Sequence, residues 1–179
     1  MSQQSEIDRV SKIICKIIRR IDHGKDLDKT LNDYTNARGM FINLDEVTET
    51  LVYSALQLAS KCHALTKGQH NGKTQTFVKA CIAYAHITIP TLENLQKQVN
   101  LFFLSAQVAL LNGLIGETES LLRGVLATLS ENFKDTPMDL AYTTQVVLRM
   151  LGFLVVVPSN PEAHYFELVE GIMQLMKIH

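Results

Sequence analysis

Residues 68–90 of the chain are GQHNGKTQTFVKACIAYAHITIP, a glycine-containing turn followed by an apolar segment. The first seven residues look like a phosphate-binding loop, which requires a glycine, four residues and then Gly-Lys-Thr. Only three residues separate Gly68 from Gly72, and Lys67 stands where the first glycine is required. A phosphate-binding loop also follows a strand, whereas the residues before this turn have helical spacing. We therefore interpret Gly68–Thr74 as a turn between two helices.

The segments on both sides of this turn have the periodicity of helices. The preceding helix is expected to start at Asn43, a capping residue, with Glu46 three residues later as in a capping box, and to end at Gly68. Its apolar residues cover more than half of the helix circumference, which predicts neighbours on two sides. The following helix is expected over about residues 73–89, before a proline.

The rest of the chain also has helical patterns. We expect further helices over residues 6–22, 26–38, from 91, 101–112, 117–131, 138–157 and from 161 onward. Gly24 is placed to end the first helix in a left-handed cap, and Asn160-Pro161 to open the last. No segment combines two-residue alternation with hairpin turns. The sequence therefore predicts an all-α fold of about nine helices.

The helix lengths and short connections favour an α-solenoid. Antiparallel helix pairs repeating about every 40 residues are typical of HEAT-like solenoids. No sharp repeat consensus is present, so a compact helical bundle remains an alternative. A free-standing solenoid needs a polar terminal helix, but the last helix is apolar over about half its surface, at Phe166, Leu168, Val169, Ile172, Met173, Leu175 and Met176. We expect residues 1–179 to form one solenoid segment, part of a longer solenoid or covered at this end by another protein.

Composition excludes several classes of protein. With 179 residues, 46% of them hydrophobic, and a net charge of −1, the chain is globular and unlike an electrostatically driven nucleic-acid binder. Its three scattered cysteines, Cys15, Cys62 and Cys81, fit reduced thiols in a cytosolic protein. The start of the chain is polar, without a secretory signal, and the longest apolar segments, 101–115 and 146–157, are too short to span a membrane. We expect a soluble protein.

We find no pattern that predicts catalysis or cofactor binding. The histidines never pair at three- or four-residue spacing; they lie at positions 23, 63, 70, 86, 164 and 179. A zinc site would need ligands from distant helices, and we interpret His86, in its apolar segment, as a hydrogen-bonded core or interface residue. The cluster Asp45, Glu46 and Glu49 could be paired catalytic carboxylates, but helix-start charge explains it more simply. We expect no enzyme, metal or cofactor site.

The first helix has two faces of opposite character. Its apolar side chains fall within one arc: Ile7, Val10, Ile13, Ile14, Ile17, Ile18 and Ile21. The basic side chains lie opposite: Arg9, Lys12, Lys16, Arg19 and Arg20. This basic face is either a site for a membrane surface or an acidic partner, or the solvated face of a helix whose isoleucines pack inward. We favour the solvated face, because acidic residues dilute the charge and no aromatic residue anchors the apolar side.

Residues 67–90 resemble a segment of the large scaffold subunit of the retriever complex, a paralogue of the retromer large subunit of the vacuolar protein sorting 35 family. The shared pattern is a lysine-glycine turn with a histidine, then Lys-Thr, then an aromatic-Val-basic-Ala-Cys helix that ends in Ile-Thr-Ile-Pro. Residues 24–44, 101–110 and 155–161 resemble the same subunit in the same order. The resemblance is weaker at the first helix and over residues 113–144.

The resemblance implies a function. The family subunit is a long curved solenoid whose C-terminal half cradles a small subunit of phosphoesterase-like fold, and the assembly returns cargo from endosomes to the cell surface. The chain resembles part of that half only, so contact with the arrestin-like subunit at the N-terminal end is not implied. The resemblance implies that the chain is a non-enzymatic scaffold in the cytoplasm, held on endosomes through its complex. Its implied partners are the phosphoesterase-fold subunit and other sorting subunits.

Two alternatives remain from the residues themselves. The first is a self-standing helical adaptor or protein-interaction domain outside trafficking. The second is a nucleotide-binding enzyme built on Gly72-Lys73-Thr74, which predicts affinity for ATP or GTP. No contact motif can be matched, so the sequence predicts no particular protein-binding residues.

Overall fold

A computed structural model describes residues 3–41, 43–132, 140–157 and 165–177. All regular elements in these ranges are helices, which confirms the predicted all-α class. They are α1 (Gln3–Ile18), α2 (Leu27–Met40), α3 (Asp45–Thr66), α4 (Gly72–Thr88), the short 3-10 helix η1 (Ile89–Thr91), α5 (Leu95–Leu111), α6 (Ile115–Asn132), α7 (Leu140–Val156) and α8 (Tyr165–Lys177).

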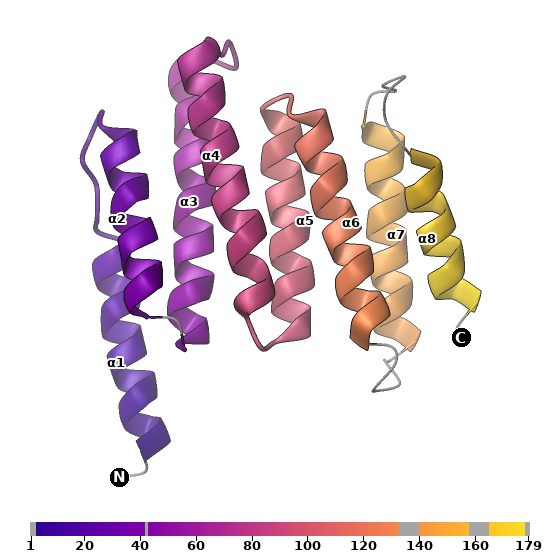
Figure 1. Cartoon of the computed structure of the whole chain (residues 1–179), viewed down its shortest axis with the longest axis horizontal. Coiled ribbons are helices and arrows are strands. Elements are labelled where there is room, and N and C mark those ends of the chain that lie inside the picture. The colour runs from indigo at the N-terminus through magenta and orange to yellow at the C-terminus, as the bar shows by residue number, and fades with distance from the viewer. Residues whose placement is uncertain (1–2, 42, 133–139, 158–164, 178–179) are drawn as a thin grey trace.

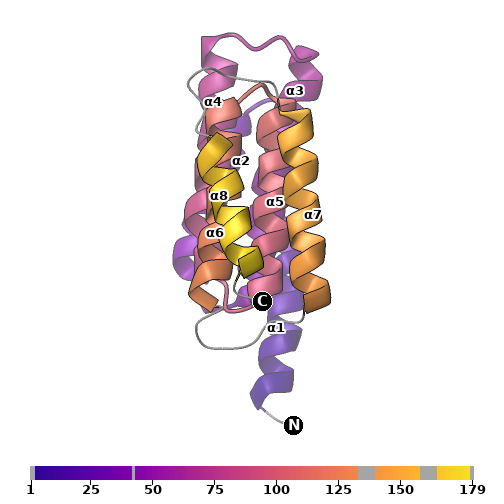
Figure 2. The ribbon, with the colours of Figure 1, turned by 90° about the vertical axis from the view of Figure 1, so that its right-hand side faces the viewer.

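The helices stack side by side as antiparallel pairs along the long axis of the molecule (Figure 1). Seen from the end of the stack, they form two layers (Figure 2). We call α1, α3, α5 and α7 the odd layer, and α2, α4, α6 and α8 the even layer. This arrangement is the predicted solenoid-like stack of helix pairs and not a compact bundle around one central axis.

The core lies between the two layers, and α3 contributes most to it. Val47, Leu51, Val52 and Ala55 of this helix have no exposed surface. Helix α3 packs against α1 and α5 in its own layer and against α2 and α4 in the other. Its broad apolar arc therefore has neighbours on more than one side, as the sequence predicted.

The end of α3 follows local signals, but its start does not. Lys67 and Gly68 adopt positive φ angles of 53° and 77°, and the Gly68 N–H donates to the His63 carbonyl at 3.0 Å, so Gly68 ends the helix as predicted. The predicted capping box at Asn43 is wrong. Leu44 is the N-cap residue, and its side chain makes no capping hydrogen bond.

Two further helix boundaries differ from the prediction. Helix α1 ends at Ile18, so Gly24 does not cap it; Gly24 has a φ of 66° in the following loop, where its N–H donates to Asp22 Oδ1 at 2.9 Å. The two helices expected from residue 91 and over 101–112 are the single helix α5, preceded by η1. Asn94 caps α5, with its Oδ1 accepting the Lys97 N–H at 2.9 Å. The predicted opening of the last helix at Asn160-Pro161 lies outside the described residues.

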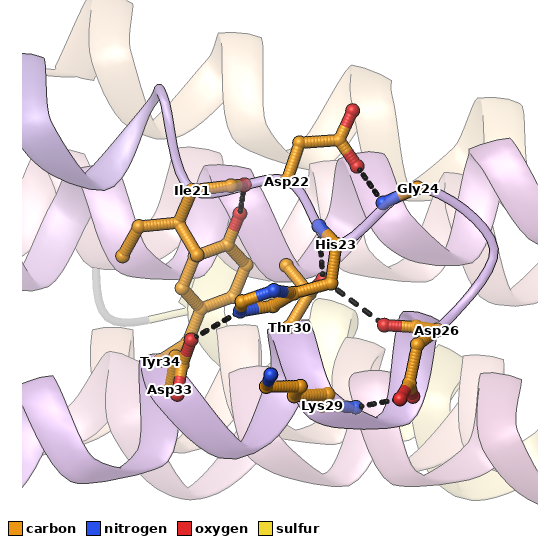
Figure 3. Close-up of polar contacts among 9 residues, drawn as sticks. All are labelled: Ile21, Asp22, His23, Gly24, Asp26, Lys29, Thr30, Asp33 and Tyr34. Atoms are coloured by element: carbon orange, nitrogen blue, oxygen red, sulfur yellow. Dashed lines mark hydrogen bonds and ion pairs between the residues drawn. The ribbon is translucent and has the colours of Figure 1, made fainter.

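The loop between α1 and α2 is tied down by polar contacts (Figure 3). His23 Nε2 lies 2.6 Å from Asp33 Oδ2, and the His23 N–H donates to Thr30 Oγ1 at 3.3 Å. The Tyr34 hydroxyl donates to the Ile21 carbonyl at 3.5 Å. These contacts connect the loop after α1 to the first turns of α2, while α1 itself packs on α3.

Candidate protein-interaction surfaces

The Gly68–Thr74 segment joins α3 to α4, as the sequence analysis proposed. Asn71 Oδ1 accepts the Thr74 N–H at 2.9 Å, and Thr74 Oγ1 accepts the Asn71 N–H at 2.9 Å, which completes a capping box. The hydroxyl of Thr74 therefore stabilises a helix start, and the segment follows a helix and not a strand. The sequence pattern does not indicate this box, because threonine replaces the usual glutamate or glutamine at its fourth position.

The acidic cluster at the start of α3 does not converge on one point. Asp45 Oδ2 accepts the Glu93 N–H at 3.1 Å, and Glu49 Oε2 lies 2.7 Å from Lys97 Nζ. Glu46 is exposed on the surface of the first turn. Glu46 and Glu49 line the same hollow. Glu49 is nevertheless paired with Lys97 and Asp45 accepts a backbone N–H, so the arrangement fits helix-start charge and not a pair of catalytic acids.

The fold brings together two histidines that are seven residues apart. The rings of His63 and His70 have centroids 5.8 Å apart. His70 Nε2 lies 2.9 Å from Asn112 Oδ1, which connects the α3–α4 turn to the α5–α6 turn. His86 is half-buried, with its ring edge-on to Phe102 at 6.0 Å. Across the residues that the structure describes, no group of three or more His, Cys, Asp or Glu side chains could hold a metal ion.

The three cysteines are free and buried. Burial raises the pKa of the Cys62 thiol and, more strongly, that of Cys81. The Cys15 Sγ donates to the Glu46 carbonyl at 3.3 Å. Since the thiolate is the reactive form of cysteine, the buried thiols Cys62 and Cys81 act as small apolar side chains.

An apolar ridge on α1 is exposed to solvent. It consists of Ile7, Val10, Ile13 and Ile17, and Ile17 is 59% exposed. The prediction that the whole isoleucine arc packs inward is therefore wrong. Ile18 is buried and Ile14 half-buried, because α3 packs on only part of the arc. We call this ridge, at one end of the stack, the α1 end face.

The opposite end of the stack also exposes apolar side chains. Leu148, Leu151 and Val155 of α7 are exposed, as are Val169 and Met173 of α8. Leu168 and Ile172 are buried, and α8 packs on α6. Of the apolar residues predicted to cover the last helix, the side chains of Phe166, Leu175 and Met176 lie outside the described set. We call this surface the α7–α8 end face.

A hollow of about 400 Å³ opens on the odd layer between α1, α3 and the first turn of α5. We call it the basic groove. Four of the residues that line it are cationic and two are acidic; the full lining is Lys12, Cys15, Lys16, Arg19, Glu46, Glu49, Thr50, Tyr53 and Lys97. The sequence indicated the basic face of α1. The hollow also depends on α3 and α5, so it could not be predicted from α1 alone.

Stacked antiparallel helix pairs place the chain in the class of α-solenoid proteins. Within the described ranges, no helix has the length and apolar character needed to cross a bilayer. Residues 1–178 match the family model described as the VPS35L C-terminal domain, and the chain belongs to this family. The resemblance in the sequence to a large VPS35-like scaffold subunit is confirmed.

Several curated relatives have similar sequences. The "VPS35 endosomal protein sorting factor-like" protein of Dictyostelium discoideum is 34% identical over 99% of the chain. The corresponding proteins of Danio rerio and Homo sapiens are 32% and 28% identical, over 92% and 99% of the chain. The chain spans only 18 to 19% of the length of these relatives.

Proposed function

We propose that the chain is a non-enzymatic scaffold segment of an endosomal cargo-recycling coat. The observation that carries this proposal is the match to the VPS35L C-terminal domain over residues 1–178. The relatives are described as endosomal protein sorting factors. A solenoid of helix pairs suits this role, because it offers a long surface on which other subunits can dock.

The proposal includes a place for the chain within a longer solenoid. The α1 end face exposes an apolar ridge where another helix pair would stack in a solenoid. Contiguous exposed apolar surface usually marks a surface that another element covers. We propose that residues 1–179 form one section of such a stack, with a neighbouring helix pair packed against Val10, Ile13 and Ile17.

The partners follow from the same role. We propose that the chain binds a small subunit of phosphoesterase-like fold and further endosomal sorting subunits. It would act in the cytoplasm and reach the endosome surface through the complex, without contacting nucleic acid. A net charge of −1 supports the absence of nucleic-acid contact, since nucleic-acid binders present large basic surfaces.

A domain exchange tests the proposal. The corresponding C-terminal domain of the Dictyostelium discoideum relative is replaced by residues 1–178, and the chimera is expressed in cells that lack the relative. We expect it to localise to endosomes, to retain the phosphoesterase-fold subunit in affinity capture, and to restore recycling of membrane cargo. An unrelated helical repeat of equal length is the control.

The outcome separates the proposal from its alternative. A chimera that resists proteolysis as well as the intact relative, yet stays diffuse and retains no phosphoesterase-fold subunit, would contradict the scaffold role. That result would favour a helical adaptor outside trafficking.

A further inference from the structure

The basic groove has one wall whose charge is not neutralised. Lys12, Lys16 and Arg19 follow one another at four- and three-residue spacing, so they share one face of α1 and its last turn. Their side chains are exposed, and none of them forms an ion pair with another residue in the described part of the chain. Lys97 differs, because its ammonium group lies 2.7 Å from Glu49.

This wall is held in a fixed orientation. Cys15 and Ile18, on the adjoining face of α1, are buried, and the Cys15 Sγ donates to the Glu46 carbonyl of α3. Beyond the helix, the contact of His23 with Asp33 ties the loop to α2 (Figure 3). The cationic side chains therefore extend from a backbone that needs no rearrangement to meet a ligand, which reduces the entropic cost of binding.

The floor and the opposite wall indicate what kind of ligand fits. Tyr53 is 41% exposed and offers a ring for an apolar contact, and the buried Cys15 and Thr50 lie at the base. Glu46 and Glu49 stand across from the cations. Glu49 is paired with Lys97, so a bare phosphate or an anionic membrane surface would meet repulsion mainly from Glu46, whereas a peptide can place acidic side chains on one side and N–H groups on the other.

We propose that the basic groove binds an acidic linear peptide segment of a partner protein. Carboxylates of the peptide accept hydrogen bonds from Lys12, Lys16 and Arg19, and one apolar side chain packs on Tyr53. Backbone N–H groups of the peptide face Glu46. A hollow of about 400 Å³ accommodates a few side chains of such a segment. This peptide-binding inference is independent of the proposed trafficking role, and the test of peptide binding does not depend on that role.

The test begins with selection from a random library of displayed dodecapeptides, panned against the full 179-residue chain. We expect the selected peptides to be acidic and to contain an aromatic or aliphatic residue. They should lose binding to the double variant Lys12→Glu with Lys16→Glu. The matched control, Lys25→Glu with Lys29→Glu, has the same charge change at exposed positions outside the groove and should keep binding.

Fluorescence anisotropy with the best selected peptide then gives the affinity. We expect Kd to rise at least about tenfold in the groove variant and to rise with salt in the parent chain. The neutral variant Lys12→Gln with Lys16→Gln gives a smaller loss, and circular dichroism checks that each variant is folded. Selection of neutral or basic peptides, or equal binding by groove and control variants, would overturn the proposal. Binding to phosphatidylserine-containing vesicles that is lost in the groove variant, without acidic peptides, would assign the groove to a membrane instead.

Discussion

Asn71 distinguishes a helix start from a phosphate-binding loop in the Gly68–Thr74 turn. Its side chain accepts the Thr74 N–H at the beginning of α4. We expect Asn71→Ala to lower the free energy of unfolding by about 1 kcal/mol, because the first turn of α4 loses its acceptor. Urea denaturation followed by circular dichroism measures this change.

Lys73→Ala is the matched control for this prediction. Lys73 is exposed in the same turn of the helix, so we expect its removal to change the free energy of unfolding by less than about 0.5 kcal/mol. Calorimetry with ATP or GTP and magnesium should give no binding signal for the parent chain. Nucleotide binding that disappears in Lys73→Ala would show that the turn holds a phosphate after all.

Gly124 permits a close approach between two helices. A Cβ atom at this position would lie 2.8 Å from Phe102 Cε1, and Phe102 is buried in α5. We expect Gly124→Ala to lower the free energy of unfolding by about 1 to 3 kcal/mol, because the ring must leave its packed position. Thermal unfolding measures the loss.

Gly152 provides the opposite case in α7. A Cβ atom there meets nothing within 4 Å. We expect Gly152→Ala to raise the free energy of unfolding by about 0.5 to 1 kcal/mol, since alanine restricts the unfolded chain and favours helix. If Gly124→Ala also raised the free energy of unfolding, the contact between Gly124 and Phe102 would not control the spacing of α5 and α6.

At the scale of elements, α2, α3 and α4 enclose side chains that must remain protonated. Burial raises the pKa of Cys62 and Cys81 above the ordinary value of 9.0, and that of Tyr34 and Tyr84 above 10.0. The unfolded chain therefore loses these protons at lower pH than the folded chain. The resulting stabilisation is fully present below about pH 8, before the exposed thiols titrate, and is lost as the pH rises beyond it.

We accordingly expect the free energy of unfolding to fall between about pH 8 and pH 10.5, the range in which exposed cysteine and tyrosine titrate. Guanidinium denaturation at fixed salt measures the slope. Cys81→Ala should make the slope shallower, because one raised pKa is removed. A free energy of unfolding that stays constant over this range would show that these four groups titrate alike in both states.

Local signals determined which helix boundaries could be predicted. Helix α4 was expected over residues 73–89 and spans Gly72–Thr88, because glycine and proline stand at its two ends. The start of α3 was missed because Asn43 satisfies the capping pattern, while Leu44 occupies the N-cap position. A helix was wrongly expected to start at residue 91, directly after Pro90. Pro90 instead lies in the short helix η1 (Ile89–Thr91), and the next α-helix, α5, starts at Leu95.

At the scale of the whole molecule, periodicity shows which residues of a helix are apolar but not which of them have a neighbour. Ile13 and Ile18 belong to the same predicted arc, yet Ile13 is exposed and Ile18 buried. Contacts between turns are equally hidden: nothing in the sequence places His70 beside Asn112. The basic groove required α1, α3 and α5 together, so sequence analysis could identify its cations and not its shape.

The exposed α1 end face leads to a prediction about association. Apolar contact between copies should make the parent chain self-associate, because the side chains of this ridge are exposed. We expect Val10→Glu with Ile13→Glu to shift the chain toward monomer in sedimentation velocity over a concentration series. The stability of the fold should change by less than about 1 kcal/mol, since both residues are exposed.

The control Leu65→Glu with Ile87→Glu changes two exposed apolar residues of α3 and α4, away from the α1 end face, and should leave association unchanged. A parent chain that is monomeric at every concentration, or an equal effect of both pairs, would contradict stacking at the α1 end face.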